Sequence, residues 1–203
     1  MKGAARVHAR LGPRPVRGDP SETAARLTVA AARMFEEHGY FATDSNAIAR
    51  AAGYAPGTFY KNFEDKTAAF VAAYAWWVAS VWSGVDEAWA APLDAAARVR
   101  AAVRHVVRVH GEWPGFRRDL RHLAVTEPRV TKAFTSNRRA QLERLVAIAG
   151  EKRRTECFAL MLATERTADA LAMGEASHMG IDADALEREL VRQAQALLVP
   201  SRP

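Results

Sequence analysis

Two short amphipathic segments joined by a tight turn constrain the fold of this chain more than any other feature of its sequence. The first segment carries Ile48, Ala49 and Ala52, and Gly53 follows at the place where a left-handed helix cap needs glycine. Pro56 then fits the first turn of a second helix, because the N–H group that proline lacks would have no partner there. Two short helices with glycine at the joint are the sequence form of a helix-turn-helix.

The remainder of the 203 residues also predicts helices, since apolar side chains recur at helical spacing and β-type alternation is never sustained. One helix is expected from about Ser21 to Gly39, and a long one from beyond Asp65 to about Ala90. Glycine and proline divide the rest of the pattern, and Asp182 is expected to cap the final helix. For the first short segment, either Thr43 or Asp44 fits the N-cap. The sequence therefore predicts an all-α protein of about nine helices.

The positive charge is concentrated at the amino end. The chain has 29 Lys and Arg against 23 Asp and Glu, a net charge of +6. Residues 1–18 contain no acid and hold the basic residues Lys2, Arg6, Arg10, Arg14 and Arg17. We interpret residues 1–18 as a flexible basic arm. It is either a solvated tail or a segment that lies along DNA, in which case Arg14 and Arg17 contact the duplex.

Several classes of protein are disfavoured. The single cysteine, Cys157, forms no internal disulfide and favours a reducing, cytoplasmic compartment. No apolar run approaches the ~20 residues that span a bilayer, so no membrane partner is expected. His105 and His110 are five residues apart and share no helix face, so we expect no metal site. The chain contains no motif of a hydrolase, zinc protease, phosphate loop or dinucleotide site. We therefore expect that it is not an enzyme and that it binds no cofactor.

The segment from about Ala24 to Phe70 resembles the DNA-binding domain of the TetR (tetracycline-repressor) family of bacterial regulators. The match covers about a quarter of the chain, and its order and spacing are highly specific. The residues that carry it are Phe35, Gly39, Tyr40, Thr43, Ile48, Ala49, Ala52, Gly53, Gly57, Thr58, Tyr60, Phe63 and Lys66.

This resemblance implies roles for individual residues in DNA binding. Thr43 corresponds to a phosphate contact at the start of the first short helix. The front of the second short helix would face the major groove with the residues Ala55, Pro56, Gly57 and Thr58. Tyr60 resembles the family's phosphate-binding tyrosine, and Lys61 would reach a base edge or a phosphate. Position 55 departs from the family, because alanine replaces a small hydroxyl side chain and the N-cap hydrogen bond, worth ~1 kcal/mol, is lost.

Lys66 has two interpretations. It lies in the first turn of a helix, where the dipole disfavours a cation by ~0.3–1 kcal/mol unless an anion binds there as well. A phosphate would contact both the ammonium and the unpaired N–H groups, as the resemblance implies. Alternatively, Lys66 is a surface lysine that pairs with Glu64 or Asp65.

The larger carboxy-terminal part contains the candidates for a ligand site. Four of the five tryptophans lie within fourteen residues, Trp76, Trp77, Trp82 and Trp89. Core packing explains them as well as a ligand cavity does, but the resemblance implies that this helix borders a pocket, which is expected to be apolar. The candidate lining residues are Trp77, Val103, His110, Trp113, Phe116, Met161 and Glu165. Glu165 would meet a cationic ligand, or else is a paired or solvated carboxylate.

The resemblance implies a domain order of the arm at 1–18, a helix-turn-helix domain at 19–66 and an effector-binding and dimerisation domain at 67–203. The last two helices, around Met161–Leu171 and Leu186–Leu197, correspond to the family's dimerising pair, although their apolar stripes could instead close the monomer core. The expected function is a homodimeric repressor that binds a palindromic operator and is released by a small, apolar or aromatic ligand. A ligand-independent activator or architectural regulator is the alternative, and an all-helical enzyme is a distant third.

Overall fold

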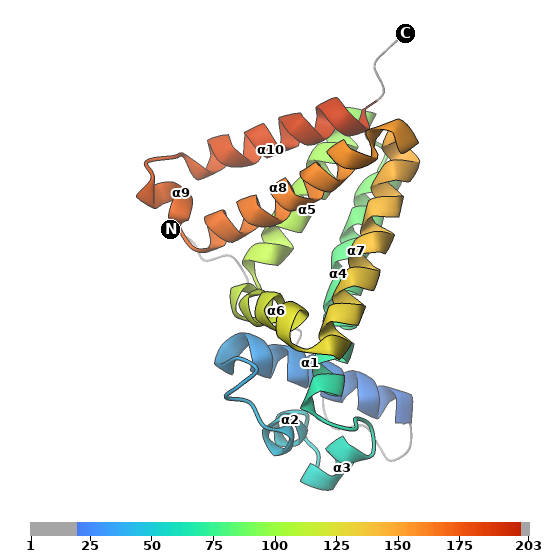
Figure 1. The fold of residues 1–203 in the computed structure, drawn as a ribbon, viewed down its shortest axis with the longest axis vertical. Coiled ribbons are helices and arrows are strands. Elements are labelled where there is room, and N and C mark those ends of the chain that lie inside the picture. Colours follow the sequence, from blue (N-terminus) through green and yellow to red (C-terminus); the bar gives the residue numbers. More distant parts are fainter. Residues whose placement is uncertain (1–19, 200–203) are drawn as a thin grey trace. The chain divides into compact units, whose positions relative to one another are not determined.

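A computed structural model describes residues 20–199 of the chain. Within that range it contains ten α-helices, one turn of 3-10 helix and no strand (Figure 1). The prediction of an all-α protein of about nine helices is confirmed, with one short helix more than expected. The additional short helix has only four residues, Glu175–His178, too few to show a helical period in the sequence.

The helices follow the glycine and proline breaks of the sequence closely. Their bounds are α1 Pro20–His38, α2 Ser45–Ala51, α3 Pro56–Tyr60, α4 Lys66–Ala90, α5 Ala95–Gly111, α6 Pro114–Thr126, α7 Pro128–Ala149, the 3-10 turn Glu151–Arg153, α8 Arg154–Ala172, α9 Glu175–His178 and α10 Ala183–Leu198.

The chain divides into two compact units. Of the described residues, the first comprises 20–76 together with Gly115–Val130, and the second comprises Trp77–Pro114 and 131–199. The first unit therefore contains α1 to α3, the start of α4, and also α6, which is distant in the sequence. Helices α4 and α7 contribute residues to both units.

The first unit is held together by large apolar side chains that are fully buried. Phe35 of α1 contacts Phe70 of α4 with ring centroids 5.2 Å apart, and Phe116 of α6 stacks on Phe70 at 4.9 Å. Ile48 of α2 and Phe59 of α3 are also fully buried. Each short helix thus contributes an anchor to this core, which is what fixes helices too short to be stable alone.

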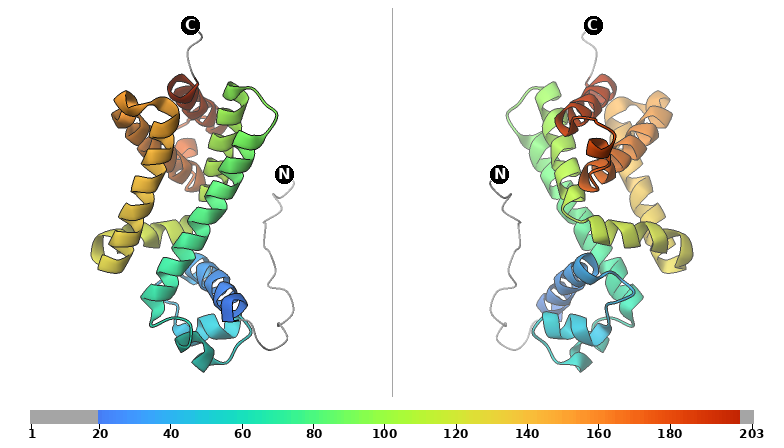
Figure 2. Two further views of the ribbon diagram at one scale, coloured as in Figure 1. Left: turned by 90° about the vertical axis from the view of Figure 1, so that its right-hand side faces the viewer. Right: turned by 90° about the vertical axis from the view of Figure 1, so that its left-hand side faces the viewer.

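In the second unit, α5, α8 and α10 pack against one another (Figure 2). Their shared core contains Val99, Val103, Val107, Cys157, Leu160, Ala168, Leu190, Val191, Ala194 and Leu197. The apolar stripe of α10 and part of that of α8 therefore close the monomer core. Asp182 caps α10 as predicted, by accepting hydrogen bonds from the N–H groups of Asp184 and Ala185.

Helix α4 is the one described helix that is long and apolar enough to cross a membrane by length and composition alone. This differs from the expectation that no run approaches that length. However, Phe70, Tyr74, Trp77 and Val81 on this helix are buried by other parts of the protein. A core helix meets the same two criteria, so α4 is weak support for a membrane span.

Candidate nucleic-acid interface

The short helix α3 presents small side chains at its front and polar side chains at its rear. Ala55, Pro56 and Gly57 are exposed, and Thr58 is half-buried. A Cβ placed at Gly57 would meet no atom within 4 Å, so packing within the chain does not require glycine there. A bare backbone at this position instead leaves room for the close approach of another molecule.

The rear of α3 carries the two residues with the greatest reach. Tyr60 is 60% exposed although it contacts Phe59, with ring centroids 5.3 Å apart, and Lys61 is exposed as well. Phe59 between them and the core is fully buried, so it fixes the direction in which α3 faces. A phenol and an ammonium projecting from one short helix suit phosphate oxygens.

The N-termini of α2 and α3 are capped differently. Asp44 caps α2, with its Oδ1 accepting a 2.7 Å hydrogen bond from the N–H of Ala47. Ala55 precedes α3 and makes no side-chain cap, as the sequence predicts. Between the helices, Gly53 has φ +82°, the left-handed conformation for which glycine was expected.

The structure places Thr43 in the interior of the first unit. The residue is only 2% exposed, and its hydroxyl donates to the carbonyl of Gly39 at 2.7 Å. Of the two candidates that the sequence offered for the N-cap of α2, Thr43 and Asp44, the structure therefore has Asp44. The side chain of Thr43 holds the turn before α2, and its contact with a phosphate remains a prediction.

Lys66, in the first helical turn of α4, binds the backbone of the loop that precedes α2. Its Nζ donates to the carbonyl oxygens of Tyr40 at 2.8 Å and Thr43 at 2.9 Å, and lies 4.3 Å from the centre of the Tyr40 ring. Partial burial lowers the pKa of the Lys66 ammonium, and the charge of Asp44 opposes that shift. An ammonium has three donors, so one is left over from these two bonds for a phosphate.

The acids next to Lys66 pair with another residue. Asp65 Oδ2 accepts from Arg129 at 2.7 Å, and Glu64 lies 3.6 Å from the same guanidinium. Arg129 lowers the pKa of the Asp65 carboxyl, whose other oxygen caps α4 at the N–H of Ala68. The alternative interpretation, in which Lys66 pairs with Glu64 or Asp65, is therefore wrong, since both acids pair with Arg129.

Sequence reasoning missed Glu36, which lies in the last turn of α1. Its Oε2 accepts a 2.7 Å hydrogen bond from the N–H of Phe116 at the start of α6. Burial raises the pKa of the Glu36 carboxyl, and the N–H groups of Phe116 and Gly115 oppose that shift. An acid at the carboxy end of a helix opposes the helix dipole. That mismatch was the one signal in the sequence that Glu36 serves another element.

The candidate ligand residues occupy several places. Trp77 and His110 are both buried in the second unit and contact each other, with ring centroids 4.9 Å apart. Glu165 pairs with Arg138, which is the alternative that the sequence offered for it. Phe116 lies in the first unit on Phe70. Val103 and Met161 are buried in the second unit, and Trp113 is half-buried.

The predicted contacts of Arg14 and Arg17 with DNA lie outside the described residues.

Comparisons with known proteins support the resemblance of the amino-terminal segment to the TetR family. Residues 27–73 match the family model described as bacterial regulatory proteins, tetR family. No curated protein matches the chain significantly.

Solved structures match over most of the chain. One is a TetR-family transcriptional regulator from Streptomyces coelicolor, with TM-score 0.65 and 21% identity over 89% of this chain and 90% of that one. A TetR-like transcriptional regulator from Rhodococcus sp. RHA1 gives 0.64 and 20%, over 91% and 100%. The fatty acid degradation regulator FadR from Bacillus halodurans gives 0.63 and 18%, over 92% and 100%. At these identities the similarity shows the fold.

Proposed function

We propose that this chain, whose residues 27–73 match the model of the tetR family of bacterial regulatory proteins, is a cytoplasmic repressor that binds a palindromic operator as a homodimer and is released by a small ligand. The observation that carries DNA binding is the exposed face of α3. Its front is bare, its rear carries Tyr60 and Lys61, and Phe59 anchors it from behind. Such a helix fits the major groove with its amino end toward the bases.

In this proposal the small front of α3 selects sequence, and the basic groups supply affinity. Ala55 to Thr58 approach the base edges, while Tyr60 and Lys61 contact the sugar-phosphate backbone. Lys66 adds a phosphate contact from the first turn of α4. Arg14 and Arg17 lengthen the contact along the duplex. Because these cations displace counterions, binding falls steeply with salt.

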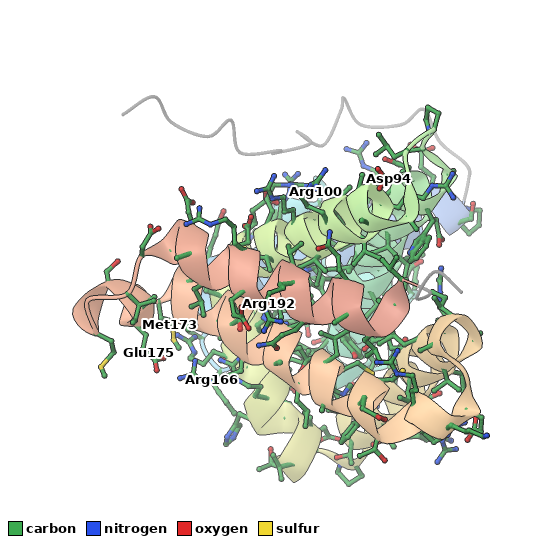
Figure 3. The ribbon with its side chains drawn as sticks, turned by 90° about the horizontal axis from the view of Figure 1, so that it is seen from above. Asp94, Arg100, Arg166, Met173, Glu175 and Arg192 are labelled. Carbon is green, nitrogen blue, oxygen red and sulfur yellow. The ribbon has the colours of Figure 1, made fainter. Side chains whose placement is uncertain are left out.

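We place the dimer interface on the outer faces of α8 and α10, since the inner faces are already used by the monomer core. The outer face of α8 exposes Phe158 and Leu162, two large apolar side chains one turn apart. Beside it, α10 exposes Ala185, Arg192 and Ala196 along one stripe. Figure 3 shows Arg192 on α10, and Arg166 with Glu175 at the α8–α9 end, where the two side chains form an ion pair. Apolar residues flanked by ion pairs are typical of protein interfaces.

Leu162→Glu is expected to convert the dimer to a monomer, because a charged side chain that must lose its water would replace an apolar one at the interface. Burying a charge at an interface costs several kcal/mol, which corresponds to a dissociation constant raised by at least about 100-fold. Sedimentation velocity measures the change. Leu93→Glu is the control, since Leu93 is 45% exposed, close to the 47% of Leu162, and lies between α4 and α5. A dimer of unchanged stability in Leu162→Glu would contradict this placement.

The ligand would act by shifting the population of dimers away from the spacing that matches two half-sites. The predicted lining residues Trp77, Val103, His110, Trp113, Met161 and Glu165 all lie in the second unit, where Trp77 and His110 contact each other. Because FadR is a regulator of fatty acid degradation, acyl compounds join aromatic ones in a thermal-shift screen. If no such compound stabilises the protein, a ligand-independent regulator is favoured.

Selection from a randomised duplex library tests the proposed function. The expected result is an inverted repeat whose half-sites are about one helical turn apart, roughly 34–36 Å. The selected duplex and a scrambled duplex of the same length and composition are then titrated over a range of salt. If selection enriches no sequence at low ionic strength, sequence-specific DNA binding is excluded.

A further inference from the structure

The turn between α1 and α2, residues 39–43, is held by hydrogen bonds within the turn and by others from helices distant in the sequence. Within the turn, the hydroxyl of Thr43 donates to the carbonyl of Gly39. From α4, the ammonium of Lys66 binds the carbonyl oxygens of Tyr40 and Thr43. Since Asp44 follows as the N-cap, the place where α2 begins depends on what fixes this turn.

Helix α6 holds the same turn through a buried carboxylate. Asp119 is only 6% exposed, and its Oδ2 accepts a 2.6 Å hydrogen bond from the backbone N–H of Tyr40. Its Oδ1 accepts from Nε of the neighbouring Arg118 at 3.1 Å. Hydrogen bonds to an ionised acceptor are the stronger ones, and a buried carboxylate depends on them.

Glycine makes this approach possible. Gly39 has φ +82°, a conformation that side chains with a Cβ rarely adopt. A Cβ at this position would also lie 3.2 Å from Oδ2 of Asp119 and 3.3 Å from Arg118. The turn is therefore shaped to receive the carboxylate at short range.

A second contact, independent of Asp119, fixes α6 against α1. Glu36 accepts from the N–H of Phe116, and the backbone of α6 at Gly115 comes close to the Glu36 carbonyl. Two carboxylates, one from each helix, thus join this part of the first unit. Glu36 of α1 binds the start of α6, and Asp119 of α6 binds Tyr40 in the turn that follows α1. Asp119 is presented to the turn by a helix that is already docked in the first unit.

We infer that Asp119 is a positioning residue of the DNA-binding site. Through the backbone N–H of Tyr40 it sets where α2 begins, and so how α2 and α3 together meet the duplex. The backbone of Tyr40 is held from two helices, because its N–H donates to Asp119 of α6 and its carbonyl oxygen accepts from Lys66 of α4. The turn of residues 52–55 joins α3 directly to α2, so a displaced α2 carries α3 with it. This inference rests on the proposed function.

The test compares the affinities of Asp119 variants for the selected duplex and for a scrambled duplex. Asp119→Ala removes the acceptor, and the preference for the selected duplex is expected to fall about tenfold or more. Asp119→Asn retains an oxygen for the Tyr40 N–H and is expected to keep most of the preference. Arg118→Ala is the matched control, because it removes the other partner of the same carboxylate and leaves the bond to Tyr40 in place. Should Asp119→Ala fail to fold, Asp119→Ser removes both carboxylate oxygens and leaves a shorter polar side chain that tolerates water.

The measurement is made well below the unfolding temperature of each variant. A merely structural role for Asp119 would lower that temperature and leave the preference ratio unchanged, which would overturn the inference. Equal losses in Asp119→Asn and Asp119→Ala would overturn it as well. Failure of the wild-type protein to prefer any duplex is a separate outcome, because it would contradict the proposed function itself.

Discussion

Gly115→Ala is expected to destabilise the protein by about 1–3 kcal/mol, the usual cost of an added methyl group in a closely packed site. A Cβ at Gly115 would lie 2.4 Å from the backbone carbonyl oxygen of Glu36, and a backbone atom cannot rotate away as a side chain can. Helices α1 and α6 would have to separate, which also weakens the bond between Glu36 and the start of α6. Urea unfolding followed by circular dichroism measures the loss.

Gly111→Ala is the control for that substitution. Gly111 is the last residue of α5, and a Cβ there would meet nothing within 4 Å. Alanine is favoured over glycine in a helix by about 0.5–1 kcal/mol, so this variant should be unchanged or slightly more stable. If Gly115→Ala unfolds at the same urea concentration as the wild type, the contact between α1 and α6 is not as close as the structure has it.

Lys66→Ala is expected to weaken DNA binding at least tenfold at low salt, for two reasons that can be separated. Loss of a phosphate contact lowers affinity for selected and scrambled duplexes alike and reduces the salt slope by about one. Loss of the bonds to Tyr40 and Thr43 releases the turn before α2, which lowers the preference for the selected duplex. It also lowers stability by about 1–3 kcal/mol, because two carbonyls lose a charged partner.

Lys61→Ala separates the two effects. Lys61 is exposed at the C-cap of α3, so its removal should reduce affinity and salt slope with little change in stability. Fluorescence anisotropy over a salt series and thermal unfolding on both variants give the comparison. An unchanged salt slope in Lys66→Ala would restrict Lys66 to the role of holding the turn, and unchanged binding would remove it from the interface.

Much of the local structure could be predicted because it depends on neighbours in the sequence. Pro56 opens α3, Gly53 adopts a left-handed conformation, and Asp182 caps α10, each for a reason that concerns one or two turns of chain. The missing cap at Ala55 was also predictable, since alanine has no oxygen to offer. The four-residue α9 was not, because it is shorter than the window in which a helical period can be recognised.

The partners of charged and polar side chains were harder to predict. The sequence offered Glu64 or Asp65 to Lys66, but those acids meet Arg129, which is over sixty residues away in the chain. Likewise, the apolar stripe of α10 fits both a dimer interface and a monomer core, and the structure uses it for the core. Periodicity shows that a face is apolar, and it does not say what covers that face.

The sequence alone determined which segments are helices, where they end and how α2 and α3 are joined. Backbone hydrogen bonds, helix caps and glycine conformations depend on residues only a few positions apart. The association of α6 with the turn before α2 was decided only by the tertiary structure. Asp119 and Tyr40 are 79 residues apart, and a buried carboxylate can be matched to a backbone N–H only once the chain has folded back on itself.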